Sequence, residues 1–166
     1  GTSPLSSDSD NDGYMDGLEV VNLYSPARGV SAGLMDDSQF SYYNNDAGYS
    51  FLHPQQFALT VLDEAKPGDI IMTSSEKETV VVSVQENPGD LTLFEWLVSI
   101  SPMIRFDDFE SFETREGRAV LAGPQKTAYY VAFPETHSVL VVFYTSPGEY
   151  GYTTTVRMMV ESILSK

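Results

Sequence analysis

The strongest constraint on this chain is an acidic segment at residues 8–19, close to its beginning. Counted along these twelve residues, the acids occupy positions 1, 3, 5, 9 and 12, which are Asp8, Asp10, Asp12, Asp16 and Glu19. Position 6 is Gly13. Carboxylates this close together repel one another strongly unless a cation lies among them. The segment is therefore expected to curve around a metal ion.

Calcium is the ion that this pattern fits. Ca²⁺ takes about six to eight oxygen ligands in a flexible cage. Alternate spacing lets a curving backbone aim the first three aspartates at one point, and Gly13 permits the sharp turn. At positions 7 and 9, Tyr14 offers its backbone carbonyl and Asp16 binds directly or through water. Glu19 is long enough to close the cage with two oxygens. The predicted calcium ligands are thus Asp8, Asp10, Asp12, Tyr14, Asp16 and Glu19.

Two alternatives remain for this segment. It could be a solvated acidic loop without a metal, although chance acidic runs do not place glycine and glutamate at these positions. It could also bind Mg²⁺, although that ion prefers to keep its waters and avoids cages made only of protein ligands.

The loop is not a complete EF-hand, because residues 1–7 cannot form an entering helix; a short exiting helix is expected at about 16–23. With Gly1-Thr-Ser-Pro4-Leu5 ahead of the loop, residues 1–26 resemble the thrombospondin type 3 repeats of bacterial surface proteins. Leu23-Tyr24-Ser-Pro26 resembles the start of another unit, but Met35-Asp-Asp-Ser38 lacks the acidic pattern. The resemblance implies a last repeat whose earlier members lie upstream. A dockerin fits less well, because dockerins pair two such loops.

Composition excludes several functions. The 166 residues carry a formal charge of −15, which disfavours nucleic acid and anionic membranes as partners. There is no cysteine, and no apolar run approaches the roughly 20 residues of a membrane span. Neither a signal peptide nor direct membrane insertion is therefore expected in this fragment. We expect an exported protein, extracellular or on the cell surface, whose signal and anchor lie outside it.

The remaining pattern predicts an α+β fold, an antiparallel sheet flanked by helices. We expect a calcium-binding repeat at 1–27, a linker at 28–41 and an α/β domain at 42–166. Thr92 and Glu95 form a capping-box signature for a helix at 92–101. A second helix is expected from the apolar spacing between Val156 and Leu164. The expected strands are 49–53, 69–74, 79–85, 118–122, 127–133 and 138–145.

The larger domain resembles the PsbP-like (Mog1/PsbP) family. The resemblance rests on Tyr43-Asn-Asn-Asp-Ala-Gly48-Tyr-Ser-Phe51-Leu-His-Pro54, on the strand, turn and helix entry at 82–97, and on the closing helix. One departure is Gln55-Gln-Phe57, where the family usually has tryptophan. The resemblance implies the fold and an exported module, but no assigned chemistry.

No catalytic site is evident. His53 and His137 are expected at turns, as surface or capping residues with ordinary titration. Asp107, Asp108, Glu110 and Glu113 suggest paired carboxylates or a second metal site, but an acidic loop flanking two phenylalanines is favoured. An aromatic ligand platform is conceivable, but sheet packing is favoured, for Tyr42, Tyr43, Tyr150 and Tyr152.

The leading hypothesis is a calcium-binding extracellular structural and interaction module without enzymatic activity. In it the repeat is a calcium-stapled spacer, and the PsbP-like domain binds an unknown protein or cell-envelope partner. One alternative is a hydrolase with a polar pocket that holds a histidine beside a carboxylate. The other is a carbohydrate-binding module that uses coplanar, exposed tyrosines.

Overall fold

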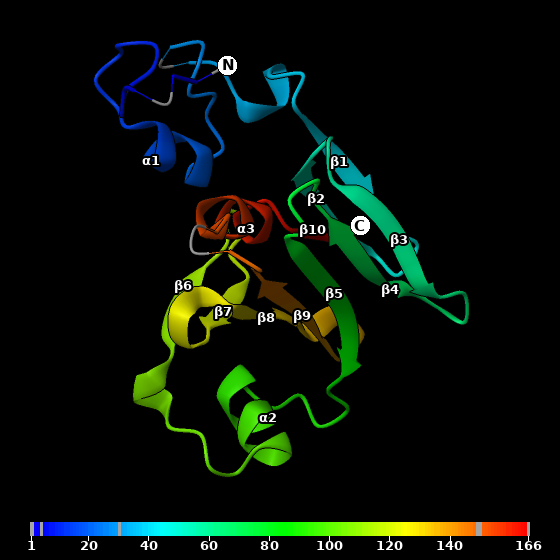
Figure 1. Cartoon of the computed structure of the whole chain (residues 1–166). Coiled ribbons are helices and arrows are strands. Elements are labelled where there is room, and N and C mark those ends of the chain that lie inside the picture. Colours follow the sequence, from blue (N-terminus) through cyan, green and yellow to red (C-terminus); the bar gives the residue numbers. More distant parts are fainter. Residues whose placement is uncertain (1, 4, 30, 149–150, 166) are drawn as a thin grey trace.

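The fold is built on a seven-stranded antiparallel sheet, seen in a computed structural model that describes residues 2–3, 5–29, 31–148 and 151–165 (Figure 1). The central strands of this sheet are long and come from distant parts of the sequence. In spatial order the strands are β3 (Ala58–Asp63), β4 (Lys66–Thr73), β5 (Thr79–Glu86), β9 (Ser138–Thr145), β8 (Ala128–Phe133), β7 (Ala119–Ala122) and β6 (Glu110–Glu113).

A smaller sheet and three helices accompany the large sheet. The small sheet has the order β1 (Phe40–Asn44), β2 (Tyr49–Pro54) and β10 (Leu164–Ser165). The helices are α1 (Asp16–Val21), α2 (Leu93–Ile100) and α3 (Thr153–Glu161). Short 3-10 turns are η1 (Leu34–Asp36), η2 (Phe106–Asp108), η3 (Pro124–Lys126) and η4 (Pro134–Thr136). Figure 1 shows α2 on one side of the large sheet and α3 on the other. The predicted α+β class is confirmed.

Alternation along the strands explains this layering. In β8, Tyr129 and Val131 belong to the core on the α3 side, whereas Tyr130 packs against the smaller core under α2. In β9, Leu140 belongs to the core on the α3 side and Val139 to the core under α2. Successive side chains of a strand point to opposite faces, so a strand that is apolar throughout needs cover on both.

The core on the α3 side extends into the N-terminal segment. Leu34 is 0% exposed and belongs to this core, and Val20 and Leu23 pack against it. Helix α1 contacts α3. We expected residues 28–41 to be a linker and did not predict that Leu34 belongs to this core. Apart from Met35, the neighbours of Leu34 in the sequence are small or polar, so no periodicity marks it as a core residue.

Helix α2 confirms the predicted capping box. The Thr92 hydroxyl accepts a hydrogen bond from the Glu95 amide at 3.3 Å, and the Glu95 carboxylate accepts one from the Thr92 amide at 3.0 Å. These reciprocal bonds satisfy two amides that a helix start would otherwise leave without partners. The Thr92 hydroxyl, which also donates to the Glu95 carboxylate at 2.8 Å, and the Thr92 amide hold the pKa of Glu95 below its usual range.

The six strands expected from alternation are all present as β2, β4, β5, β7, β8 and β9. Strands β1, β3, β6 and β10 were not among them, and Leu164 lies in β10 because the helix expected to reach it ends at Glu161. The expected acidic loop at 107–113 is wrong in its second half, because Glu110–Glu113 form β6. Strands β3 and β6 lie at the two edges of the large sheet and are mostly exposed, so they lack the apolar alternation of a buried strand.

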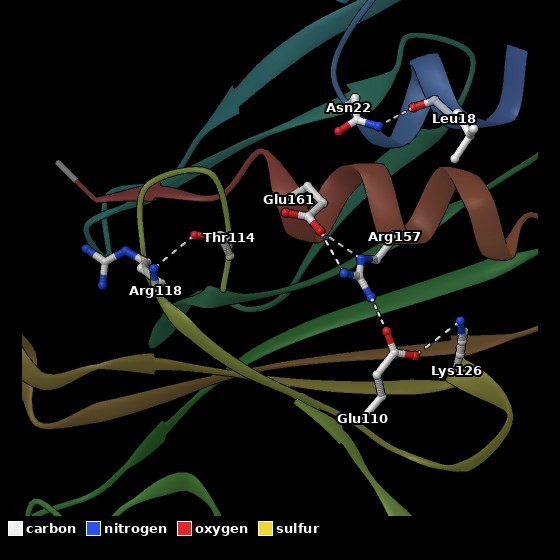
Figure 2. Close-up of polar contacts among 8 residues, drawn as sticks. All are labelled: Leu18, Asn22, Glu110, Thr114, Arg118, Lys126, Arg157 and Glu161. Atoms are coloured by element: carbon white, nitrogen blue, oxygen red, sulfur yellow. Dashed lines mark hydrogen bonds and ion pairs between the residues drawn. The ribbon is translucent and has the colours of Figure 1, made fainter. Parts of the chain in front are cut away.

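An ion-pair network ties α3 to the β6 edge of the large sheet (Figure 2). The Arg157 guanidinium contacts the Glu161 carboxylate at 2.8 Å and the Glu110 carboxylate at 3.2 Å. Lys126 reaches the other oxygen of Glu110 at 3.2 Å. The same guanidinium lies over the Phe112 ring. The network therefore holds α3 against one side of the core. Helix α1 covers the same core.

Replacing Leu34 with alanine tests whether this residue belongs to the domain core. We expect Leu34→Ala to lower the free energy of unfolding by about 2–5 kcal/mol, because it leaves a cavity in the main core. The matched control is Leu5→Ala, since Leu5 is 97% exposed and its loss should cost less than about 0.5 kcal/mol. Urea denaturation in calcium measures both. Equal stability of the two variants would contradict a core role for Leu34.

Candidate metal centre

Three aspartates converge at the beginning of the chain. Asp8, Asp10 and Asp12 each offer a carboxylate oxygen, and these oxygens lie within 4.8 Å of one another. Within the described ranges, no other group of three or more His, Cys, Asp or Glu side chains meets in this way. The cluster could hold a metal ion, and it contains the first three residues of the predicted ligand set.

Backbone amides hold the loop in its curve. The Asp8 carboxylate accepts hydrogen bonds from the amides of Asp12 at 3.2 Å and Gly13 at 3.0 Å. The Asp12 carboxylate accepts one from the Tyr14 amide at 2.9 Å. Gly13 has φ = +99°, a conformation that residues with a Cβ rarely adopt. The expected role of Gly13 at the sharp turn is thus confirmed.

Glu19 gives the clearest sign that this segment suits a cation. Its side chain lies on α1 and is 4% exposed. Its Oε2 atom is buried without a hydrogen-bond partner, and so is Oδ2 of Asp12. Burial raises the pKa of Glu19, and the negative charges of Asp12, Asp10, Asp16 and Asp8 raise it further. A buried, unpaired carboxylate beside other acids is costly, and a bound cation would remove that cost. The residues present therefore fit a metal ion.

The two remaining predicted ligands differ in how the structure places them. Asp16 lies outside the converging trio, and both of its carboxylate oxygens accept hydrogen bonds from Ser9, at 2.7 Å from the amide and 2.6 Å from the hydroxyl. This side chain closes the loop on itself. Binding of the ion through water leaves both bonds in place. The Tyr14 side chain is 58% exposed, and the role of its carbonyl stays a prediction.

The loop is also joined to the rest of the molecule. One oxygen of Asp10 accepts a hydrogen bond from the Gly29 amide at 2.5 Å. A β-bridge then pairs Tyr24 with Gly33, and the Leu34 amide donates to the Leu23 carbonyl at 2.8 Å. Sequence reasoning missed Gly29 and Ser9, because contacts made by a backbone amide or a single serine leave no residue pattern. The aspartate cage and the buried Leu34 are thus connected through one short segment.

We expected His53 to lie at a turn and to titrate like a surface histidine. The structure shows a different setting. His53 is within β2, opposite Ser41 of β1. Its Nδ1 is 2.9 Å from the Pro54 carbonyl and its Nε2 is 3.3 Å from the Ser41 hydroxyl, so Nδ1 carries the proton in the neutral ring. Burial lowers the pKa of His53, although the bond to Pro54 partly opposes this. Half-burial within the sheet explains the difference from a surface histidine.

His137 does lie at a turn. It has φ = +50° and ends the hairpin between β8 and β9. Its Nδ1 is 2.6 Å from the Asp90 carboxylate, and both side chains are more than half exposed, at 63% and 58%. This pair joins the hairpin to the turn that precedes α2. A histidine is therefore beside a carboxylate here, but in open solvent.

The second acidic stretch is occupied by structural contacts. Lys126 and Arg157 hold Glu110 and lower the pKa of this carboxyl, with the Lys126 contact the larger cause. Asp107 pairs loosely with Arg105 at 3.7 Å, with both side chains exposed. Asp107 and Asp108 lie in η2, whereas Glu113 ends β6. These four acids are not brought together as a metal group.

The tyrosines considered as a ligand platform lie in different settings. Tyr42 and Tyr43 are neighbours on β1, so they point to opposite faces. The Tyr43 ring is tilted by 58° against Phe51, and Tyr152 packs edge-on against Phe57. All three are partly buried against the main core. Tyr150 lies outside the described residues.

No protein-family model matches this chain, and no curated protein matches its sequence. No helix in the described part is long and apolar enough to cross a membrane.

The raised pKa of Glu19 predicts an unusual response to pH when calcium is removed. A carboxyl with a raised folded-state pKa contributes stability below its ordinary pKa, and this stability is lost as pH rises through the raised value. In chelator we therefore expect the melting temperature to be higher in Glu19→Gln than in the parent at neutral pH, with the gap closing in acid.

With saturating calcium the order should reverse, because the variant lacks the closing ligand. Glu76→Gln is the control, since Glu76 is an exposed acid outside the loop. Melts of the three proteins at several pH values, with and without calcium, measure this. A variant that is less stable than the parent in both conditions would show that Glu19 has no unfavourable charge to relieve.

Proposed function

We propose that this protein is a calcium-binding structural module, in which one ion fastens the N-terminal segment to the α+β domain. The observation that carries the proposal is the buried Glu19 carboxylate, with an unpaired oxygen, beside the aspartate trio. The proposed ligands are those of the sequence pattern: Asp8, Asp10, Asp12, Tyr14, Glu19 and, at least through water, Asp16.

Calcium is favoured over magnesium by the nature of the site. Four carboxylates and a carbonyl supply the number of oxygens that calcium takes, whereas magnesium usually keeps several waters. The charge of the site also suits a divalent ion. The ion then offsets the repulsion that the loop otherwise places next to α1 and α3.

The fastening role is supported by the contacts that lead from the loop to the core. The Asp10–Gly29 hydrogen bond, the Tyr24–Gly33 bridge and buried Leu34 follow one another along the chain. An ion that orders the loop should therefore stabilise the whole domain as well as its own residues, by mass action on the folded state. The loop acts as a calcium-dependent staple.

The wider setting is also part of the proposal. Residues 1–26 resemble a thrombospondin type 3 repeat and residues 42–166 a PsbP-like domain, and both resemblances favour an extracellular or cell-surface protein of bacteria. In that setting the repeat is a spacer, and the domain binds a protein or cell-envelope partner. The acidic surface, with a formal charge of −15, favours a partner that is neutral or basic.

Calorimetric titration of chelator-treated protein tests the site. We expect about one calcium per chain and no binding by Glu19→Ala, while Glu76→Ala binds like the parent. Trp96 is the single tryptophan and belongs to α2, which lies on the opposite side of the sheet from α1. Its fluorescence melt should therefore shift upward with calcium in the parent but not in Glu19→Ala. Calcium binding without a shift in the melting temperature would support a metal site but contradict its role in stabilising the domain.

We also expect no catalytic turnover. The nearest approach to a nucleophile and base is the Ser41–His53 contact at 3.3 Å, whose third member is the Pro54 carbonyl. A serine hydrolase also needs donors for the developing oxyanion and a substrate cleft, and the two residues are a cross-strand pair packed beside Phe51. Esterase, phosphatase, glycosidase and peptidase substrates check this. Turnover lost in Ser41→Ala or His53→Ala would reverse the conclusion.

A further inference from the structure

A pocket of about 420 Å³ lies beside the acidic loop, at helix α1. It is lined by Tyr14, Leu18, Glu19, Asn22 and Tyr24. The two tyrosines and the leucine form an apolar wall, although between 42% and 58% of each is exposed to solvent. Ligand pockets combine apolar walls with a few polar groups in fixed places. The pocket is therefore a candidate binding site.

The polar groups of this pocket mainly accept hydrogen bonds. Glu19 is buried, and its Oε2 atom has no hydrogen-bond partner. The Asn22 side-chain amide donates to the Leu18 carbonyl at 2.8 Å, which leaves Oδ1 of Asn22 as an acceptor (Figure 2). None of the described residues that line the pocket is a lysine or an arginine. A ligand that matches these groups brings hydrogen-bond donors and positive charge.

The tyrosine rings favour the same kind of ligand. The face of an aromatic ring attracts a cation, and a planar guanidinium also stacks on it. The structure contains an example at this place, because the Arg115 guanidinium lies over the Tyr24 ring, 5.2 Å from its centroid. Arg115 does not line the pocket, so the pocket itself stays open beside this contact.

Charge makes the pocket attractive to a cation with or without calcium. The five acids of the loop at residues 8–19 carry −5, and a bound Ca²⁺ brings +2, so −3 remains beside the pocket. The whole chain is acidic as well, with a formal charge of −15. Opposite charge on a partner speeds its approach and fixes its orientation.

We infer that this pocket binds an arginine side chain of a basic protein partner. The aliphatic stem of the arginine packs on Leu18, while its guanidinium lies against the tyrosine rings and donates to Asn22. Lysine fits less well, because its ammonium is a strongly hydrated point charge that does not stack. The inference rests on the proposed function in one respect, since it gives a chemical identity to the partner of the interaction module.

NMR titration of isotope-labelled protein with three short peptides, in calcium, tests the inference. The peptides differ only in a central residue, which is arginine, lysine or citrulline, the uncharged analogue of arginine. The arginine peptide should shift the amide signals of Leu18, Asn22 and Tyr24 and should bind more tightly than the other two. Added salt should weaken its binding, because salt screens the charge attraction. Equally tight binding of the lysine or the citrulline peptide would overturn the inference.

Two pocket variants and a matched control locate the binding site. Leu18→Lys places a positive charge in the pocket and should weaken binding of the arginine peptide by about tenfold or more. Tyr24→Leu removes one ring and should weaken binding by about two- to fivefold. Met103→Lys makes the same change of charge at a residue that is 92% exposed and does not line the pocket, so it should bind like the parent. A Leu18→Lys variant that binds like the parent would contradict the assignment.

Calcium titration of the same proteins separates this inference from the calcium site. None of the three changed residues is a predicted calcium ligand, so each variant should still bind calcium. Calcium binding by the parent without binding of the arginine peptide would overturn the pocket assignment alone. Binding of the arginine peptide without calcium binding would overturn the proposed calcium site and support the pocket.

Discussion

The whole structure depends on the need to cover both faces of one antiparallel sheet. Strands β5, β9 and β8 carry apolar side chains on both faces. Neither face is therefore stable when it is exposed to water. On one face, α3 and the small sheet bury the side chains around Tyr129 and Leu140. On the other, α2 covers Leu121 and Val139, and its start is fixed by Thr92 and Glu95. Every other element is placed by its relation to these two layers.

The N-terminal segment is placed by the same requirement. Helix α1 is short and has few apolar residues, so it could not persist alone in water. It gains stability where Val20, Leu23 and Leu34 meet the core beside α3. Glu19 is on the same helix and is buried by the same packing. The carboxylate is thus removed from water by the fold, and the acidic loop brings the oxygens that make a cation favourable there. Core packing and the proposed metal site thus meet at this one helix.

The sequence predicted the features that are determined by residues close together in the chain. The spacing of the acids with Gly13 predicted the aspartate cluster, and Thr92 with Glu95 predicted the start of α2. Alternating apolar residues predicted the central strands. The sequence did not predict contacts between residues that are far apart in the chain. Nothing near Leu34 signals burial, because the core that it joins is built mainly of residues far along the chain. The exposed edge strands β3 and β6 lack alternation. Arg157 and Glu110 are 47 positions apart, so their pairing has no local signature.

The position of the acidic loop has a mechanical consequence. Force applied to the N-terminal end passes along the chain through Asp8–Glu19 and the bridge between Tyr24 and Gly33 before it reaches β1. The bonds that hold these residues are therefore loaded in series with the large sheet, and the weakest of them yields first. A metal ion bound by the aspartate cluster would strengthen this first link. The sheet carries the same force, but it opens only after the weaker link has opened.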